Sequence, residues 1–261
     1  MNAHIPRKRF GQHFLCDQTV VQNIVAAITP KPGEHLIEIG PGQGAITLPV
    51  LKRAKQLEVI ELDRDLIPQL QERTEHAGRL HVYLQDVLDF DFSSIKKDAR
   101  LLRIFGNLPY NISTPLIFHL IDHSAVIADM VFMLQKEVAE RLAATANTEA
   151  YGRLSVMVQY HWHVELLFDV PATAFHPPPQ VESSILRLTP HHQIPYPVKD
   201  YALFAEVVRH AFGQRRKTLR NSLKNLVSDE VWKRVSINSQ LRAENLSVKD
   251  FALITNELSS N

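Results

Sequence analysis

The apolar positions of this 261-residue chain fall into short continuous runs that alternate with longer helical patterns. A buried strand shows such a run, whereas an amphipathic helix shows apolar residues three and four positions apart. The runs predict strands at 35–40, 57–62, 80–85, 101–105 and 128–135, and the segments between and after them predict helices at 45–54, 64–77, 136–146 and 153–162. This alternation predicts an α/β fold, a doubly wound and mostly parallel sheet with helices on both faces.

The two ends of the chain depart from this alternation. A helix is predicted to begin after Asp17, whose side chain can cap it. Two apolar runs, 163–170 and 183–190, follow each other without a helix between them and predict an antiparallel edge to the sheet. From 191 onward the pattern is helical throughout, at 201–212, 217–227, 228–235 and 247–258, after a polar, proline-bearing linker. We therefore expect one large domain over 1–190 and a small helical domain over 191–261.

Composition narrows the class of protein. Hydrophobic residues make up 45% and charged residues 22%, a balance typical of globular chains. The single cysteine excludes an internal disulfide, and the histidines lack the spacing of a metal site, so we expect no metal. No apolar run approaches the roughly 18 residues that span a bilayer. These features predict a cytoplasmic protein, and the lack of an exposed apolar stripe predicts a monomer.

Charge is distributed unevenly along the chain. Residues 1–190 hold 18 Lys and Arg against 21 Asp and Glu, whereas residues 191–261 hold 11 against 7. No acid occurs from Val207 to Ser228, although that stretch is rich in cations. Such a surface is typical of phosphate binding, although a solvated helix face would show the same pattern. The candidate phosphate-binding residues are Arg7, Lys8, Arg9, Arg209, Arg215, Arg216, Lys217, Arg220 and Lys224.

A glycine-rich turn follows the strand at 35–40. The stretch "LIEIGPGQGAIT" contains Glu38, Gly40 and Gly42, Glu61 ends the next strand, and Asp86 follows the third. Ligands of open α/β sheets lie at the carboxyl ends of strands, where glycine lets the backbone approach them. An NAD-binding turn, or a turn that merely packs helix on strand, would also contain these glycines. Three acids at successive strand ends favour S-adenosylmethionine, which offers hydroxyl, amino and ammonium groups and has no pyrophosphate.

The strand at 101–105 is followed by "GNLPYNISTPLI", an unusual strand-to-helix turn. The side-chain carbonyl of Asn107 and the backbone carbonyl of Leu108 or Pro109 can each accept one N–H of an amino group. Such acceptors would aim the lone pair of an exocyclic amine at a methyl donor and stabilise developing charge. Tyr110 offers a face on which a base can stack. The turn therefore predicts an amino-methyltransferase site, although a tight turn with Tyr110 in the core is the alternative.

Eight blocks, taken in order, resemble the ribosomal RNA adenine N6-dimethyltransferases, and among them the bacterial small-subunit branch. They are "RKRFGQHFLCD", "IEIGPGQGAIT", "VIELDRDL", "QDVLDFDF", "GNLPYNISTPLI", "MLQKEVAERL", "FHPPPQVESSILRL" and "AFGQRRKTLRNSLK". The resemblance covers almost the whole chain. It implies a Rossmann-like methyltransferase domain that dimethylates two adjacent adenosines in the 3′-terminal hairpin loop of small-subunit rRNA during ribosome biogenesis.

The resemblance also implies roles for single residues. His13 and Leu15 would contact the cofactor, together with Gly40, Glu61, Asp86 and Asn107. Phe175 would sandwich the target base against Tyr110. Two positions depart from the family pattern: His13 stands where Asn is common, and Gln180 stands where Lys is common. The first departure leaves the hydrogen bond of residue 13 open, and the second removes one potential RNA contact.

Four other functions remain open at this point. A large-subunit adenine methyltransferase of the macrolide-resistance type shares the turn and the aromatic residue, but the C-terminal block and "FHPPPQVES" favour the small-subunit branch. A DNA adenine methyltransferase more typically has two prolines in the turn. The chain could also act mainly by binding, as a ribosome-assembly factor, and an NAD oxidoreductase is the most distant alternative.

Overall fold

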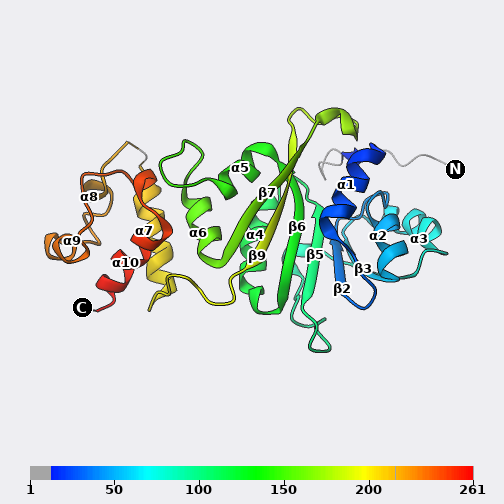
Figure 1. Ribbon diagram of the computed structural model, residues 1–261, viewed down its shortest axis with the longest axis horizontal. Coiled ribbons are helices and arrows are strands. Elements are labelled where there is room, and N and C mark those ends of the chain that lie inside the picture. Colours follow the sequence, from blue (N-terminus) through cyan, green and yellow to red (C-terminus); the bar gives the residue numbers. More distant parts are fainter. Residues whose placement is uncertain (1–12, 215, 261) are drawn as a thin grey trace. The chain divides into compact units, whose positions relative to one another are not determined.

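The computed structural model describes residues 13–214 and 216–260 (Figure 1). The chain forms two compact units. The first contains the described residues up to Ala139 together with Glu165–Pro190, and the second contains Glu140–Val164 and the residues from His191 onward. The linker predicted after residue 190 thus coincides with one of the points at which the chain crosses from one unit to the other. The second unit also includes Glu140–Val164, a segment from the middle of the chain.

A seven-stranded sheet has the strand order β4-β3-β2-β5-β6-β9-β7. Neighbouring strands from β4 to β6 pair in parallel, and β9 pairs with β6 in antiparallel fashion. The predicted mixed sheet is therefore confirmed, with β7 rather than β9 at the edge. The strands are β2 (His35–Ile39), β3 (Gln56–Glu61), β4 (Arg79–Leu84), β5 (Leu102–Asn107), β6 (Ile127–Gln135), β7 (Trp162–Val170) and β9 (Ser183–Pro190). Strand β5 thus runs two residues beyond the predicted end.

Helices connect these strands and cover the sheet (Figure 1). As predicted, Asp17 caps the first helix, because its side chain accepts hydrogen bonds from Thr19 N and Val20 N at 2.8 and 3.1 Å. The helices of the first unit are α1 (Gln18–Ile28), α2 (Thr47–Ala54), α3 (Ile67–Thr74) and α4 (Ser113–Asp122). Helix α5 (Lys136–Ala143) begins in the first unit and ends in the second, and α6 (Arg153–His161) belongs to the second.

Both faces of the sheet are buried, which explains the continuous apolar runs in the sequence. Leu36 of β2 and Phe105 of β5 belong to the hydrophobic cluster that includes side chains from α1, α2 and α3. Ile37 and Ile104 are equally inaccessible to solvent. Because side chains alternate along a strand, these two lie on the opposite face.

In the second unit, α7 (Tyr201–Phe212), α9 (Asp229–Val235) and α10 (Val248–Leu258) match predicted helices. The helix predicted over 217–227 is wrong in length, because α8 covers only Leu219–Ser222. The chain then turns, with Leu226 N and Val227 N both donating to Leu223 O. Buried Leu219, Leu223 and Val227 keep a four-residue spacing across this turn, so the sequence resembles a continuous helix. Among the described helices of the chain, none has the length and apolar character needed to cross a membrane.

A separate two-stranded sheet joins distant parts of the first unit. Strand β1 (Phe14–Leu15) pairs antiparallel with β8 (Phe175–His176), with Leu15 opposite Phe175. The backbone N–H groups of Cys16 and Asp17 both donate to Ala174 O, at 2.9 and 3.2 Å. This pairing, which was not predicted from the sequence, brings β1 next to the loop that precedes β9.

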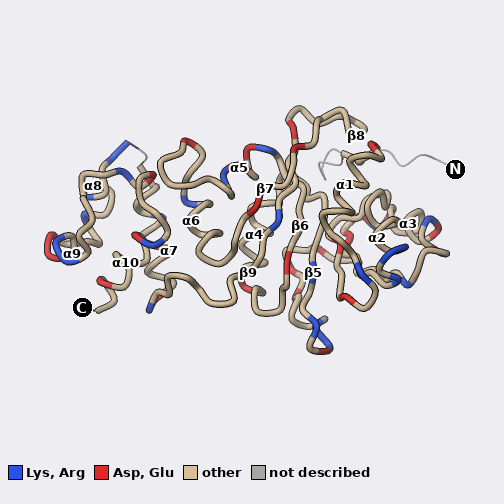
Figure 2. The backbone as a smooth tube through the Cα atoms, in the orientation of Figure 1, with Lys and Arg blue, Asp and Glu red and all other residues tan. Residues whose placement is uncertain are grey.

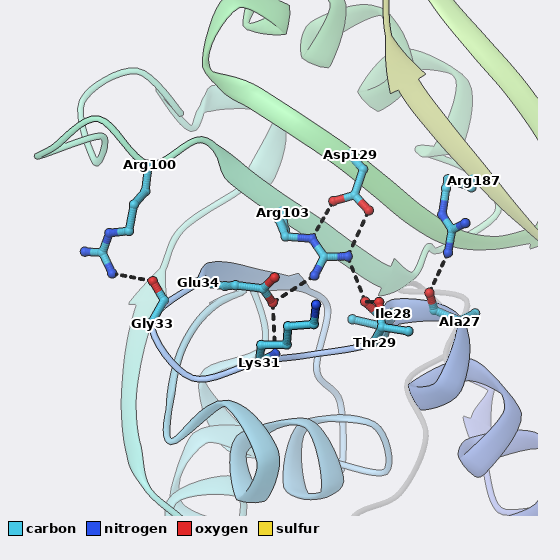
Figure 3. A network of polar contacts seen from close by, with 10 residues as sticks. All are labelled: Ala27, Ile28, Thr29, Lys31, Gly33, Glu34, Arg100, Arg103, Asp129 and Arg187. Atoms are coloured by element: carbon cyan, nitrogen blue, oxygen red, sulfur yellow. Dashed lines mark hydrogen bonds and ion pairs between the residues drawn. The ribbon is translucent and has the colours of Figure 1, made fainter.

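A guanidinium network fixes the other end of α1 (Figure 3). Arg103 of β5 donates to both carboxylate oxygens of Asp129 on β6, at 2.7 and 2.9 Å. It also donates to Glu34 at 2.8 Å and to the carbonyl of Ile28, the last residue of α1, at 2.7 Å. Arg187 donates to Ala27 O at 2.6 Å. Two arginines of the sheet thus hold the carboxyl end of the helix that follows β1.

Replacing the central arginine should destabilise the first unit. Arg103→Gln leaves Asp129 and Glu34 without their cationic partner in a half-buried site, which should cost about 3 kcal/mol of unfolding free energy. Urea unfolding of the purified protein measures the loss. Arg100→Gln serves as the control, because Arg100 pairs with Asp98 on the surface. Equal losses in the two variants would contradict this account.

Candidate functional site

One pocket lies at the carboxyl ends of β2, β3 and β5, with β1 forming part of its wall. It brings together all the candidate cofactor-binding and catalytic residues. They are His13, Leu15, Glu38, Gly40, Gly42, Glu61, Asp86, Asn107, Leu108, Pro109, Tyr110 and Phe175. Because parallel strands end at the same edge, residues from separate motifs converge there.

The glycine turn has the backbone conformation that its sequence predicts. Gly40, Gly42 and Gly44 have φ angles of 66°, 55° and 82°, in the left-handed region that disfavours other residues. The Gly40 N–H donates to Ile60 O at 2.9 Å, which ties the turn to β3. A Cβ on Gly42 would lie 3.4 Å from the ring of Phe14, so β1 passes close to this turn.

Glu61 holds the glycine turn from the end of β3. One carboxylate oxygen accepts from Gly42 N at 3.2 Å, and the other accepts from Asp63 N at 2.8 Å. Burial raises the pKa of Glu61, and these backbone N–H groups oppose that effect. The carboxylate therefore remains an acceptor next to the turn, where a ribose hydroxyl could also donate to it.

Glu38 is the most deeply buried acid of the pocket, with 2% of its surface exposed. Among the described residues, its Oε2 atom has no hydrogen-bond partner. Burial raises the pKa of Glu38 to about 8; the nearby Thr47 hydroxyl opposes the shift and the charge of Glu61 adds to it. Burial therefore favours the protonated form of this acid.

Asp86 contributes the third acid, two residues beyond β4. Its Oδ1 accepts from Leu88 N at 2.9 Å and caps a short 3-10 helix. This local bond fixes the half-buried side chain at the wall of the pocket.

The Asn107–Tyr110 turn presents two oxygen acceptors. The Asn107 Nδ2 atom donates to His13 O at 3.4 Å, an orientation that leaves Oδ1 as an acceptor. Leu108 N continues the sheet by donating to Met133 O, and Pro109 O accepts from Ile112 N at 3.1 Å. No described residue donates to the carbonyl of Leu108. With respect to the described residues, the free acceptors are thus Asn107 Oδ1 and Leu108 O.

The aromatic residues differ in part from the expected sandwich. Phe175 is 3% exposed and packs in the hydrophobic cluster, although its side chain also reaches the pocket. The ring stacked on Tyr110 is His13, with centroids 6.0 Å apart and planes inclined by 27°. The Nδ1–H group of His13 donates to Pro177 O at 2.8 Å, so this residue also ties β1 to the proline-rich loop.

The candidate RNA-binding cations of the second unit lie at the end of α7 and around α8 (Figure 2). Arg209, Lys217 and Lys224 line one hollow together with His210, Gln214, Asn221 and Asn225. Arg209 pairs with Glu206 at 3.6 Å, and Arg220 pairs with Asp229 at 2.8 Å. Arg216, Lys217 and Lys224 are exposed. Arg7, Lys8, Arg9 and Arg215 lie outside the described residues.

Comparison with known proteins identifies the family. The model of the ribosomal RNA adenine dimethylase family matches residues 3–260. The chain belongs to this family. The ribosomal RNA small subunit methyltransferases A of Klebsiella pneumoniae and Escherichia coli are each 52% identical to it over 260 residues, which cover 99% of this chain and 95% of each relative. The resemblance seen in the sequence motifs is thereby confirmed, including its small-subunit branch.

Solved structures extend the match to the fold of the dimethylase. A dimethyladenosine transferase from Plasmodium falciparum superposes with a TM-score of 0.82 at 27% identity, covering 95% of this chain and 98% of that one. The 23S rRNA methyltransferase ErmE has a TM-score of 0.73 at 20% identity, with 94% and 99% covered, and shares the fold. The predicted Rossmann-like methyltransferase architecture is confirmed.

The raised pKa of Glu38 predicts how the stability of this dimethylase depends on pH. The folded state binds the proton of Glu38 more tightly than the unfolded chain, in which the pKa is near its usual 4.5. The resulting stabilisation is complete below that pH and is lost as the pH rises towards 8. Glu38→Gln cannot ionise, so its stability relative to wild type should increase from pH 5 to pH 8, by up to about 1.4 kcal/mol per pH unit.

Glu58→Gln provides a control, because the pKa of Glu58 is shifted in the opposite direction. Burial raises the pKa of Glu58, but His35 and the Tyr83 hydroxyl lower it more, so that the net shift is downward. Ionised Glu58 stabilises the folded protein at neutral pH, and this contribution disappears in acid. The difference in stability between wild type and Glu58→Gln should therefore shrink as the pH falls. Urea unfolding at three pH values measures both effects. Parallel profiles for wild type and Glu38→Gln would show that Glu38 does not hold a proton in the folded state.

Proposed function

We propose that the protein transfers methyl groups from S-adenosylmethionine to N6 of two adjacent adenosines in the 3′-terminal hairpin loop of small-subunit rRNA. The product is N6,N6-dimethyladenosine, formed in the cytoplasm during ribosome biogenesis. The observation that carries the proposal is the convergence, in one pocket, of an acid-lined glycine turn with the two free acceptors of the Asn107–Tyr110 turn. Family membership supports the reaction type and the RNA substrate.

The chemistry of the pocket fits S-adenosylmethionine better than a dinucleotide. The described lining contains Glu38, Glu61 and Asp86 but no Lys or Arg that could neutralise a pyrophosphate. Acidic side chains suit the hydroxyl, amino and ammonium groups of S-adenosylmethionine. When bound, this cofactor supplies an electrophilic methyl group on a sulfonium. Glu61 would accept from the ribose, Asp86 would lie near the adenine, and the unpartnered Oε2 atom of Glu38 would offer a further polar contact.

The Asn107–Tyr110 turn would prepare the amino group of the target adenine for attack. The lone pair of an adenine amine is delocalised into the ring, so the nitrogen must rehybridise before it can attack. Asn107 Oδ1 and Leu108 O would accept its two N–H bonds, and this arrangement points the lone pair towards the methyl group. Fixed acceptors of this kind stabilise the positive charge that develops on nitrogen. Tyr110 would hold the base by stacking.

Removal of the amide acceptor tests this mechanism. Asn107→Ala should lower turnover by about 100-fold or more, because a preorganised acceptor is removed. Unmethylated small and large ribosomal subunits are incubated with methyl-labelled S-adenosylmethionine, and nucleosides are analysed by mass spectrometry. Asn23→Ala, which alters an exposed amide of α1 that does not line the pocket, should lose far less activity. Unchanged turnover in Asn107→Ala, with the fold intact, would refute the proposed role of the amide.

The same assay distinguishes the other functions. Dimethyladenosine in the small subunit alone supports the proposal. Label in the large subunit would instead indicate the macrolide-resistance type of activity. Cofactor binding without label in either subunit would leave an assembly factor that acts by binding.

We further propose that the hollow between α7 and α8 contacts the rRNA backbone. Lys217 and Lys224 are exposed cations there, and the amides around them can donate to phosphate oxygens. This would make the second unit the RNA-contacting part of a monomeric enzyme. The cations would contribute affinity rather than sequence discrimination.

The salt dependence of binding tests this surface. The double variant Lys217→Ala/Lys224→Ala should weaken binding to small subunits and should reduce the slope of log K against log salt by about 1 for each phosphate that is no longer neutralised. Arg220→Ala is the comparison, because Asp229 already neutralises this guanidinium, and its slope should change less. Filter binding at several salt concentrations measures the slopes. An unaltered slope in the double variant would exclude phosphate binding by these lysines.

A further inference from the structure

Tyr110 is tied to the sheet through its phenolic oxygen. This oxygen lies 3.1 Å from Oγ of Ser183, the first residue of β9. We propose that Ser183 is a positioning residue that sets the ring plane of Tyr110 and hence the orientation of the adenine stacked on it. The inference rests on the proposed function and adds a residue from a strand outside the cofactor and acceptor motifs.

Tyr110 requires such an anchor because of its place in the chain. It lies in the connection between β5 and α4, and its side chain is only half-buried. Rotation of the ring about its side-chain bonds would tilt a stacked base and move its amino group away from Asn107 Oδ1 and Leu108 O. A hydrogen bond to the phenolic oxygen restricts that rotation effectively, because this atom is the part of the side chain farthest from the backbone. Small errors in such alignment lower the rate of a positioned reaction strongly.

Ser183 is a rigid anchor, because residues on both sides of it are held. Its side chain is fully buried, and its backbone pairs with Gln135 at the end of β6. Next to Gln135, Lys136 forms ion pairs with Glu182 at 3.1 Å and with Asp169 at 2.8 Å. Lys136 N also donates to Glu182 O at 3.0 Å.

The neighbouring serine provides a matched control. Ser184 is as buried as Ser183, but its hydroxyl donates to Asp169 at 2.7 Å and does not contact Tyr110. Successive side chains of a strand point to opposite faces, so one serine serves the pocket and the other serves the lysine cluster. If the Ser183 hydroxyl merely satisfied a buried polar group, alanine at either position would affect only stability.

The experiment compares four variants of the full-length protein: Ser183→Ala, Tyr110→Phe, the double variant and Ser184→Ala. Tyr110→Phe retains the stacking face and removes the same hydrogen bond from its other end. Single-turnover methylation of unmethylated small subunits is measured with excess enzyme, alongside cofactor affinity by calorimetry and unfolding midpoints. We expect each single variant to slow methylation by about 3- to 10-fold, the effect of one neutral hydrogen bond. The double variant should be no slower than either single variant, and cofactor affinity should be unchanged.

The outcomes separate this inference from the proposed function. Equal, non-additive slowing with a wild-type rate in Ser184→Ala supports the positioning role. A wild-type rate in Ser183→Ala, or losses that multiply in the double variant, would overturn it. Slowing in Ser184→Ala equal to that in Ser183→Ala would likewise overturn it, because it would indicate a general effect of strand β9. If the wild-type protein does not methylate small subunits, the proposed function fails before the variants are compared.

Discussion

The close approach of β2 and β5 at their carboxyl ends is the constraint on which the site depends. A side chain on Gly106 would collide with the carbonyl oxygen of Ile39 in the neighbouring strand, so only glycine allows this contact. One residue further on, Gly40 and Asn107 begin the two functional turns, and a Cβ on Gly40 would lie only 3.8 Å from Asn107 O. The glycine turn and the Asn107–Tyr110 turn therefore leave the sheet side by side, and in the proposed mechanism this would bring a methyl donor and a target amine within reach of each other.

The charges that line the pocket between these two turns bear on which ligand it can take. Desolvation raises the pKa values of both Glu38 and Glu61, so the pocket holds acids whose ionised forms are destabilised. A cationic ligand compensates that cost, whereas a phosphate adds to it, because the described lining offers no Lys or Arg. The backbone N–H of Gly42 meanwhile bonds to Glu61 and stabilises its negative charge. This arrangement supports the proposal that the pocket takes a sulfonium cofactor rather than a dinucleotide.

The sequence predicted those parts of the molecule that repeat or that follow local rules. Periodicity identified the strands, Asp17 identified the start of α1, and glycines with acids identified the edge of the sheet at which the pocket lies. The sequence did not predict the β1–β8 pairing, because two-residue strands are too short to show an alternating pattern of apolar residues. The paired residues are also about 160 positions apart. The helix predicted over 217–227 is too long for a different reason. Leu219, Leu223 and Val227 have helical spacing, although the chain turns between them. The burial of Phe175 follows from the unpredicted pairing with Leu15, and no local pattern contains that information.

The β1–β8 pairing also explains why residue 13 makes contacts within the protein. Two-residue strands are too short to be stable alone, so this pairing depends on its surroundings. Phe14 packs over Gly42, the N–H groups of Cys16 and Asp17 donate to Ala174 O, and His13 donates to Pro177 O. His13 therefore acts at two places, because its ring stacks on Tyr110 while its Nδ1 atom holds the loop that follows Phe175. An asparagine has no ring to stack, so at this position it could supply a hydrogen bond but not the aromatic contact with Tyr110. The histidine thus links the Asn107–Tyr110 turn to the proline-rich loop through one side chain.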